Sequence, residues 1–277
     1  MDNNGQDIIR LALTEDIGSG DVTTAAILGD NDSKSVSAVI VSKSNFVLSG
    51  VRPFTQVFSQ LSNSLSIQFL KQDTEVVGCG ETLVHLSGVA KTTLSGERTA
   101  LNFLQHLSAI ATHTKKFCDI LKGSSIELRD TRKTTPGLRF CEREAVRHGG
   151  GTNHRFNLAT GILIKENHIK VAGSISEAIA RVKKNAPSGF EIEVETETLA
   201  EVSQAISSAA DMILLDNMTL EQITEAISMI GGRCKIEVSG GVTLENLAQY
   251  RNLKIDFIST SAITRGAQPI DLSLLLR

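Results

Sequence analysis

From about residue 125 onward, short apolar runs alternate with stretches of helical periodicity, and no other feature of the chain constrains its fold as much. Six runs have the length of strands: Ile126–Leu128, Gly161–Ile164, Glu191–Val194, Met212–Leu215, Lys235–Val238 and Ile255–Ile258. Helical patterns lie between the later runs, at Ile175–Val182, Leu199–Ile206 and Leu220–Ile230. Repeated strand–helix units of this kind predict a parallel sheet or barrel.

The number of these units bears on the kind of barrel. A closed barrel needs eight units, so six visible ones favour an open, incomplete α/β barrel of about seven strands. A doubly wound sheet is the alternative. Up to about residue 105 the pattern differs, with a helical stretch near residues 6–15, alternating strands such as Ser37–Val41, and a helix that opens near Ser95. That mixture is typical of a separate domain of helices and strands.

Polar or small residues follow each of the six apolar runs. They are Asp130–Lys133, Lys165–His168, Glu195, Asp216–Asn217, Ser239–Gly241 and Ser259–Ser261. The carboxyl ends of parallel strands converge on one face, and both open sheets and barrels bind their ligands there. We therefore expect these residues to form one site.

Overall composition describes an ordinary globular protein. The 277 residues are 41% hydrophobic and 21% charged with a net charge of −3, so bulk electrostatics suggest no nucleic-acid partner. The four cysteines show no CxxC pair, which disfavours a zinc site or a disulfide framework. The segment Met1–Gly5 lacks a signal-peptide pattern, and no apolar run approaches the ~18 residues that cross a bilayer. We expect a soluble, cytoplasmic protein that binds no membrane.

Positive charge is concentrated between residues 129 and 170. Arg132, Lys133 and Lys165 directly follow strands, where they could bind carboxylates or phosphates. The glycine-rich segment Gly149–Gly151 leads to His154 and Arg155, and an anion-contacting loop is about as well supported there as a simple connector. The cations indicate a substrate with several negative charges.

Two carboxylates end neighbouring strands at the same face. Glu195 and Asp216 would lie side by side against the basic residues, an arrangement that suits Mg²⁺ bound partly through substrate phosphates. The other interpretation is that each carboxylate merely pairs with a nearby lysine or arginine. We favour the metal site, with contacts to the ion made mainly through substrate and water.

A phosphate site is predicted at the last two strands. Ser239–Gly241 precedes a helix expected from about Thr243, so backbone N–H groups at a helix N-terminus could hold a phosphate. The loop around Ser259–Ser261 would lie beside it. Ordinary turn chemistry would also explain the two glycines.

Seven segments, in order along the chain, carry a family resemblance. Asp130–Arg139 reads DTRKTTPGLR, and the others are Glu15–Thr24, Glu97–Asn102, Ala145–Arg155, Leu163–Ile169, Leu214–Asn217 and Glu237–Gly241. Together they resemble the motifs of quinolinate phosphoribosyltransferases, also called nicotinate-nucleotide pyrophosphorylases. Because the matches extend over nearly the whole chain, their joint specificity is high.

The resemblance implies a fold and an activity. The fold is an N-terminal α/β sandwich, residues 1–105, joined to an open, about seven-stranded α/β barrel, residues 106–264, with the tail 265–277 packing on the first domain. The activity is transfer of a phosphoribosyl group from phosphoribosyl pyrophosphate to quinolinate with decarboxylation. The products are nicotinate mononucleotide, pyrophosphate and carbon dioxide, in de novo NAD biosynthesis.

The resemblance also implies residue roles. Lys133, Glu195 and Asp216 would be catalytic, with Lys133 close to both substrates and the two carboxylates near the ribose and Mg²⁺. Quinolinate would be bound by Arg132, His154, Arg155 and Lys165, and the 5′-phosphate by Ser239, Gly240, Gly241, Ser259 and Ser261. The enzyme would be a homodimer, or a larger oligomer, in which Arg98 reaches into the site of the neighbouring subunit.

Three departures from the family pattern stand out. Ser261 and Ala109 occupy positions where glycine is usual, and Arg143 occupies one where lysine is common. Ser261 would either narrow the phosphate pocket or add a hydroxyl donor. A related family associated with molybdenum transport also has Thr-Ser-Ala at this loop, but it lacks the Asn-His-Arg and Lys-Glu-Asn-His segments found here.

Two other functions fit parts of the pattern. A lyase could form a Schiff base on Lys165, although such an enzyme would scarcely need so many cations. A non-catalytic anion-binding protein could use the same scaffold, because a fold does not fix a function. The retention of both Glu195 and Asp216 favours the enzyme.

Overall fold

The computed structural model describes residues 3–29 and 33–277. Contacts divide the chain into a first unit, residues 1–115, 134–150 and 263–277, and a second unit, residues 116–133 and 151–262. Met1 and Asp2, part of the N-terminal segment without a leader pattern, lie outside the described residues. The predicted domain boundary at residue 105 falls inside one long helix, α4 (Ala90–Leu121).

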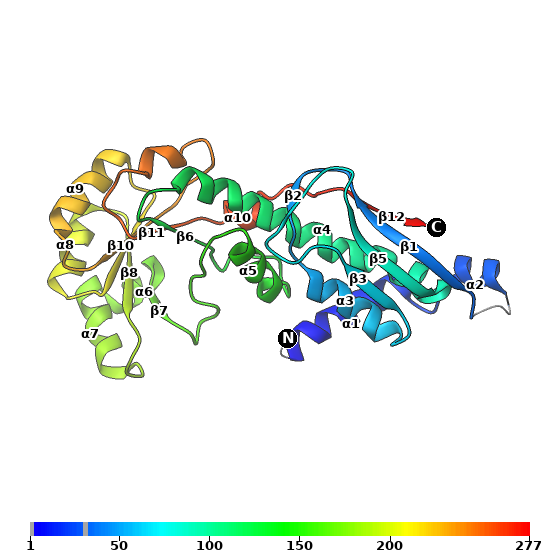
Figure 1. Ribbon diagram of the computed structural model, residues 1–277. Coiled ribbons are helices and arrows are strands. Elements are labelled where there is room, and N and C mark those ends of the chain that lie inside the picture. The colour runs from blue at the N-terminus through cyan, green and yellow to red at the C-terminus, as the bar shows by residue number, and fades with distance from the viewer. Residues whose placement is uncertain (1–2, 30–32) are drawn as a thin grey trace. The chain divides into compact units, whose positions relative to one another are not determined.

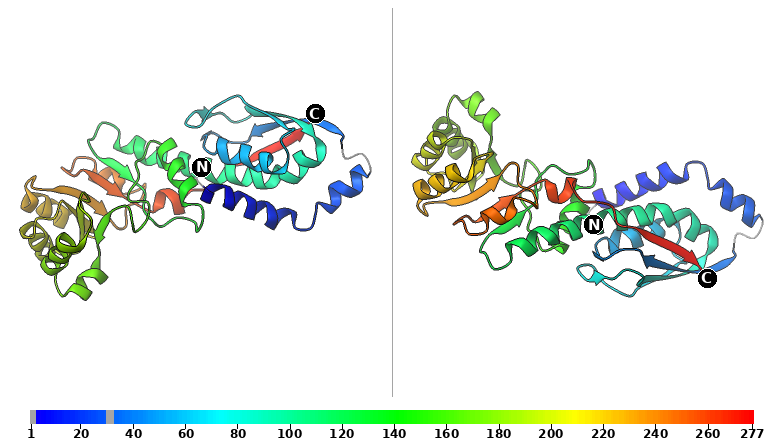
Figure 2. Two further views of the ribbon diagram at one scale, coloured as in Figure 1. Left: turned by 90° about the horizontal axis from the view of Figure 1, so that it is seen from below. Right: turned by 90° about the horizontal axis from the view of Figure 1, so that it is seen from above.

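The first unit is built on a four-stranded antiparallel sheet with strand order β12-β1-β5-β3. These strands are β1 (Ser35–Ser42), β3 (Ser66–Phe69), β5 (Thr82–Val89) and β12 (Leu272–Leu276), and β2 (Phe46–Val47) pairs with β4 (Val76–Val77). The C-terminal strand β12 runs beside β1, with Leu274 opposite Ile40 (Figures 1 and 2). The tail of the chain thus completes the N-terminal sheet.

Helices α1 (Asn3–Ile17), α3 (Val51–Leu61) and α4 form one apolar core with this sheet. The unit also contains α2 (Val22–Leu28) and α5 (Arg139–His148), while α4 and the short α10 (Ala262–Arg265) continue across the division between the units. Phe54 and Phe58 of α3 are fully buried, with their rings edge to face at 5.2 Å between centroids. The helix expected near Ser95 begins five residues earlier, because no turn residue separates α4 from β5.

The N-terminal motif Glu15–Thr24 has a structural role in this unit. Asp21 caps α2 by accepting a hydrogen bond from the Thr24 N–H at 2.9 Å, and it accepts a second from the Ser95 hydroxyl at 3.0 Å. Asp16 accepts one from the Thr99 hydroxyl at 2.9 Å. These bonds fix the N-terminal segment to α4.

Gly149, first of the three consecutive glycines, serves packing within the first unit. It ends α5, and a Cβ atom there would lie 2.4 Å from the carbonyl oxygen of Ala111 and 2.6 Å from Thr114 Cβ. Both of those residues belong to α4, so only glycine allows α5 to approach that helix so closely. Gly149 is therefore explained without a ligand.

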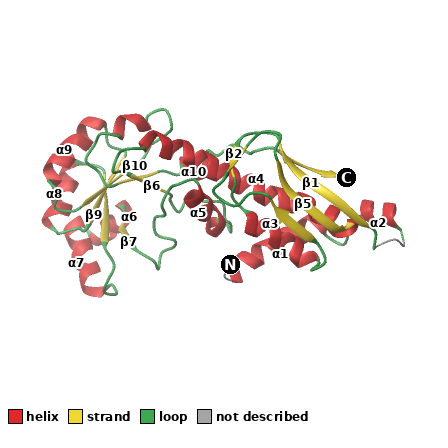
Figure 3. Ribbon diagram, in the orientation of Figure 1, coloured by secondary structure: helices red, strands yellow, loops and turns green. Residues whose placement is uncertain are grey.

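The second unit is a parallel sheet, and it confirms the predicted strand–helix alternation (Figures 1 and 3). In the described part of the chain the sheet has six strands in the order β6-β11-β10-β9-β8-β7. They are β6 (Glu127–Arg129), β7 (Ile162–Ile164), β8 (Ile192–Thr196), β9 (Met212–Asp216), β10 (Lys235–Ser239) and β11 (Phe257–Ser259). Each predicted apolar run forms one of these strands.

The position of a seventh strand is occupied by a single residue. Thr152 forms an isolated parallel bridge beside β6, where its N–H donates to Leu128 O at 2.7 Å and its carbonyl accepts from Asp130 N at 3.2 Å. The ladder stops there because the next two residues turn their polar groups onto the Asp130 side chain. About seven strands were expected, and the described part of the second unit has six strands and one isolated bridge.

The described helices of the second unit are α6 (Glu166–Ala172), α7 (Ile175–Asn185), α8 (Leu199–Ser207) and α9 (Leu220–Ile230), followed by a 3₁₀ helix η1 (Leu247–Tyr250), and three of them begin with side-chain caps. Ser174, Thr198 and Thr219 each accept a hydrogen bond from the third helical N–H of the helix that follows. Among the described helices, none combines the length and apolar character needed to span a membrane.

Candidate active site

The inward-facing positions of the second unit bring polar residues to the carboxyl ends of its strands. Successive side chains of a strand point to opposite faces, so Glu195 shares a face with Glu193, and Ser239 with Glu237. The register sets Ser239 of β10 directly opposite Asp216 of β9. One end of the sheet therefore carries the predicted site residues of this unit.

Two carboxylates and two lysines are electrostatically linked at this end. The Lys165 ammonium group forms an ion pair with Glu195. Burial raises the pKa of Asp216, and the negative charge of Glu195 raises it further, while Lys165, Lys133 and a hydrogen bond from Ser239 act in the opposite direction. The structure thus brings together Lys133, Lys165, Glu195, Asp216 and Ser239.

Asn217 holds Asp216 in place and explains the glycine at position 240. The Asn217 side-chain amide donates to Asp216 Oδ2 at 2.7 Å, and the Asn217 N–H donates to Ser239 O at 3.0 Å. A Cβ atom on Gly240 would lie 2.3 Å from Asn217 Oδ1, and the φ of Gly240 is +87°. Glycine is therefore required at position 240 if Asn217 is to support the Asp216 carboxylate.

The prediction of a helix that begins at about Thr243 is wrong. Asn246 replaces it with a local turn: its side chain accepts from Thr243 N at 2.9 Å and donates to Gly241 O at 2.8 Å. Side-chain bonds of this kind compete with helix formation. Only the 3₁₀ helix η1 follows, so no α-helix N-terminus faces the loop, and any phosphate there would meet the N–H groups of a glycine turn.

The loop after β11 contains both buried and accessible residues. Ser259 is 2% exposed, and its hydroxyl bonds to the Glu237 carboxylate. Thr260 is also buried, and it donates to Val242 O at 2.9 Å, which joins this loop to the one after β10. Ser261 is half-buried. Of the two predicted phosphate ligands in this loop, Ser261 is the more accessible to a ligand.

Buried Asp130 positions the predicted quinolinate ligands beside β6. Its carboxylate accepts from the Asn153 amide at 2.7 Å and from the His154 N–H at 2.8 Å. Arg155 follows, and it donates to Gly161 O at 3.0 Å. Burial lowers the pKa of Arg155, and the charge of exposed Arg132 lowers it further. Two guanidinium groups held near each other form a site that an anion would stabilise.

His154 lies within a buried layer that the sequence analysis missed. Its Nε2 is 2.9 Å from Glu193 Oε2 and 3.7 Å from Glu237 Oε1, and Arg129 Nη1 is 2.9 Å from Glu237 Oε2. Burial lowers the pKa of His154, but Glu193 and Glu237 raise it by more, so it lies above the ordinary 6.5. Burial and the Glu193 charge raise the pKa of Glu237. The signal for the layer was a glutamate flanked by apolar residues at the inward position of each of two strands, Glu193 in β8 and Glu237 in β10.

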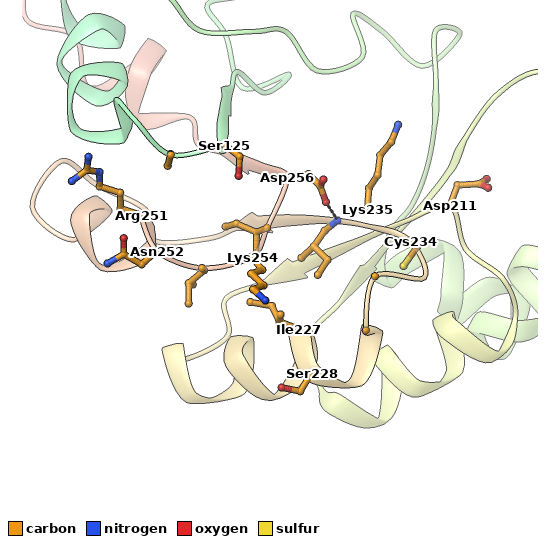
Figure 4. Close-up of a pocket in the computed structure, with 16 residues that line it drawn as sticks. Ser125, Asp211, Ile227, Ser228, Cys234, Lys235, Arg251, Asn252, Lys254 and Asp256 are labelled. Atoms are coloured by element: carbon orange, nitrogen blue, oxygen red, sulfur yellow. Dashed lines mark hydrogen bonds between the residues drawn. The ribbon is translucent and has the colours of Figure 1, made fainter.

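A separate hollow of about 1100 Å³ opens at the opposite, amino ends of the strands (Figure 4). Its two carboxylates hold strand ends in place: Asp256 accepts from Ile236 N at 2.8 Å and Asp211 from Ile192 N at 2.7 Å. Catalytic residues of α/β barrels lie at the carboxyl ends. The hollow is therefore distinct from the candidate site.

Two family models cover most of the chain. The model of the quinolinate phosphoribosyl transferase N-terminal domain matches residues 21–108, and that of the C-terminal domain matches residues 110–275. The chain belongs to the quinolinate phosphoribosyltransferase family. The resemblance found in the sequence motifs is confirmed.

Similar proteins extend over the same length. A Bacillus subtilis (strain 168) protein named a probable nicotinate-nucleotide pyrophosphorylase (carboxylating) is 40% identical, covering 94% of this chain and 89% of that protein. The crystal structure of NadC from Streptococcus pyogenes is 39% identical with a TM-score of 0.93, covering 98% of this chain and 95% of that one. The crystal structure of nicotinate-nucleotide pyrophosphorylase from Ehrlichia chaffeensis is 37% identical with a TM-score of 0.94, and the match covers 100% of both chains.

One predicted site residue of this quinolinate phosphoribosyltransferase family member lies outside the second unit. Arg98 is on α4, in the first unit, and is exposed. The other predicted ligands all belong to the second unit. Their assignment to quinolinate, ribose or phosphate stays a prediction.

Asp216→Asn is expected to stabilise the protein at pH 7 but not at pH 3. Because the folded pKa of Asp216 is raised, folding favours the neutral acid, and that contribution is lost as the pH rises through the folded pKa. Asparagine removes the charge that is unfavourable at neutral pH. Solvent screening limits the effect, so we expect melting temperature to rise on the order of 2 °C at pH 7.

Calorimetric melting of Asp216→Asn and wild type at both pH values is the measurement. Asp271→Asn, at an exposed position, is the matched control. A variant less stable than wild type at pH 7, or equally stabilised at both pH values, would contradict the electrostatic description of this site.

Proposed function

We propose that this chain transfers the phosphoribosyl group of phosphoribosyl pyrophosphate to quinolinate and releases carbon dioxide, forming nicotinate mononucleotide for NAD biosynthesis. The observation that carries the proposal is the site of the second unit, where Arg132, Arg155 and Lys165 accompany the carboxylates of Glu195 and Asp216. The chain's family and the names of its relatives support the same reaction.

The cations suit the first substrate, a pyridine with two adjacent carboxylates. Burial lowers the pKa of Arg155 and the charge of Arg132 lowers it further, and a carboxylate between the two guanidinium groups would relieve their repulsion. A guanidinium group can bind a carboxylate with two parallel hydrogen bonds. Lys165 would bind the second carboxylate by exchanging its present partner, Glu195, for the substrate.

The transfer step requires stabilisation of positive charge on the ribose. The pyridine nitrogen uses its lone pair to bond the anomeric carbon as the bond to pyrophosphate breaks, and that electron pair leaves with pyrophosphate. Glu195 and Asp216 would stabilise the developing oxocarbenium charge. Two anionic substrates repel each other in water, so most of the catalysis consists of holding them in reacting geometry.

Decarboxylation follows from the charge that the transfer creates. The pyridine nitrogen becomes cationic, so the adjacent carbon–carboxylate bond can break and leave its electron pair beside that charge. Carbon dioxide leaves, and the ring carbon then takes up a proton. Arg132 or Arg155 must release the departing carboxylate while the other carboxylate stays bound.

The same site fits Mg²⁺. Burial raises the pKa of Asp216 and the charge of Glu195 raises it further, and a divalent cation bound by both carboxylates would offset their repulsion. Glu195 and Asp216 would hold the ion, mainly through water and substrate oxygens. When bound, Mg²⁺ supplies charge neutralisation to the leaving pyrophosphate.

We also propose a homodimer, or a larger oligomer, with shared sites. Arg98 is an exposed cation in the family motif Glu97–Asn102, on a helix of the first unit. In a dimer it would pair with a quinolinate carboxylate bound by the other subunit.

The Schiff-base alternative is disfavoured because the Lys165 amine is engaged as an ammonium group by Glu195.

Incubation with quinolinate, phosphoribosyl pyrophosphate and Mg²⁺ should yield nicotinate mononucleotide and carbon dioxide in equal amounts. Product formation is measured by chromatography and by release of labelled carbon dioxide. EDTA should abolish the reaction, and excess Mg²⁺ should restore it, because pyrophosphate needs a divalent partner to leave. Absence of product would refute the function, and full activity without metal would refute the Mg²⁺ site alone.

Arg98→Ala and Lys133→Ala should each be nearly inactive, because losing one charged hydrogen bond costs on the order of 1.5–3 kcal/mol, or roughly 10- to 150-fold. Mixed together, they should regain up to about a quarter of wild-type activity, since random exchange makes half the dimers mixed and one of their two sites is intact. Steady-state assays after subunit exchange measure the recovery.

The matched control mixes Lys133→Ala with Lys165→Ala. Both lysines belong to the second unit, so a mixed dimer would contain no intact site and should stay inactive. If the Arg98→Ala and Lys133→Ala mixture also stays inactive while native mass spectrometry shows mixed dimers, Arg98 does not act across the interface.

A further inference from the structure

A layer of charged side chains lies beneath the candidate active site, inside the second unit. Arg129, Glu193 and Glu237 come from the alternate strands β6, β8 and β10, as expected of one layer in a barrel interior. Glu193 is 4% exposed and Glu237 is fully buried. His154 adjoins them, with 12% of its side chain exposed. Charged groups are buried at such a cost only where they have specific partners.

One ring nitrogen of His154 accepts a hydrogen bond, and the other lies at ion-pair distance from Glu193. Nδ1 accepts a hydrogen bond from the Arg155 N–H at 2.7 Å, so Nδ1 carries the lone pair. The ring hydrogen is therefore on Nε2, which faces Glu193 Oε2 at 2.9 Å. The geometry specifies one tautomer of the neutral ring.

A metal ion is the other ligand that a histidine and two glutamates suggest, and the geometry opposes it. Metal binding through Nε2 would require its lone pair, whereas the Arg155 N–H keeps the lone pair on Nδ1. Glu237 already has a cation, because Arg129 Nη1 lies 2.9 Å from its Oε2. His154 is therefore not available to a metal in this ring orientation.

The buried acids oppose any other orientation of the ring. Glu193 Oε1 and Glu237 Oε1 are buried without a hydrogen-bond partner among the described residues, so the layer keeps unbalanced negative potential next to His154. Rotation of the ring would turn the Nδ1 lone pair toward these oxygens. The Nδ1 lone pair would then face the lone pairs of the carboxylate oxygens, which is unfavourable in a buried site.

The effect extends to Arg155 through its backbone. The His154 N–H is fixed by Asp130 at 2.8 Å, and the Arg155 N–H is fixed by the His154 ring. Two consecutive N–H groups are thereby held, and the Arg155 side chain leaves the backbone toward Gly161 O, which it reaches at 3.0 Å. An oriented guanidinium group binds a carboxylate with less loss of entropy.

We propose that Glu193 and Glu237 are positioning residues that fix His154 as its Nε2–H tautomer and, through the Arg155 N–H, set the direction in which Arg155 meets a substrate carboxylate. The substrate part of this inference rests on the proposed function. The tautomer part rests on geometry alone, so the two can fail separately.

The first test needs no substitution. Nitrogen-15 NMR of the histidine-labelled protein, with the His154 signals assigned by comparison with His154→Gln, distinguishes the two neutral tautomers in wild type. We expect a single Nε2–H form at a pH where the ring is neutral. An Nδ1–H form, or an equal mixture, would overturn the proposal.

The second test compares Glu193→Gln and Glu237→Gln with Glu191→Gln. The first two substitutions remove a buried carboxylate at constant size, while Glu191 is exposed, directly precedes β8 and pairs with Lys235 at 2.7 Å. We expect both buried variants to mix the His154 tautomers. We also expect the KM for quinolinate to rise about tenfold and the KM for phosphoribosyl pyrophosphate to change less than about twofold.

Glu191→Gln should match wild type in every readout. An unchanged tautomer in the buried variants, or an equal rise in both KM values, would overturn the positioning role, because general loosening would affect both substrates. If one of the two buried variants does not fold, the tautomer and the KM values of the other variant test the positioning role. If wild type fails to use quinolinate, the proposed function fails, while the NMR result still judges the tautomer.

Discussion

Asp130 directly follows β6 with its carboxylate buried, and that carboxylate accepts hydrogen bonds from the Asn153 amide and the His154 N–H. Through these two bonds a glycine-rich segment that forms only one bridge of a strand is attached to the sheet at a fixed position. His154 and Arg155 depend on that attachment for their own contacts. A charged acceptor makes such bonds about twice as strong as neutral ones. The anion-binding side of the candidate site thus depends on one buried acid.

The site contains one pair of neighbouring cations and one pair of neighbouring carboxylates, and the two members of each pair repel each other. Burial and the charge of Arg132 lower the pKa of Arg155, while burial and the charge of Glu195 raise the pKa of Asp216. Each pair of like charges would be relieved by a ligand of the opposite sign. The first pair suits the carboxylates of quinolinate, and the second suits Mg²⁺ and a cationic transition state. These proposed ligands are those that the reaction needs.

The sequence predicted the features that follow from local pattern. The apolar runs became the six strands, and the helix predicted at Leu220–Ile230 has those bounds in the structure, because Thr219 caps its start and Gly231 its end. Residues after the strands were correctly placed on one face, since parallel topology requires it. The positions of strands and helices can be predicted from hydrophobic periodicity and from the residues that begin and end each element.

Features set by tertiary contacts could not be predicted in the same way. The helix expected at Thr243 gave way to a turn made by the Asn246 side chain, and the packing of Gly149 against Ala111 depends on two segments far apart in sequence. Glu193 and Glu237 were missed because they lie in different strands, far apart in sequence, and only the fold shows that they share one layer with His154.

Titration calorimetry with quinolinate and with nicotinate, which lacks the second carboxylate, tests the central claim most directly. If the cations of this site bind two carboxylates, quinolinate should bind at least about tenfold more tightly, because losing one charged pair costs on the order of 1.5–3 kcal/mol. Equal affinity for the two acids, or no binding of quinolinate, would contradict the account.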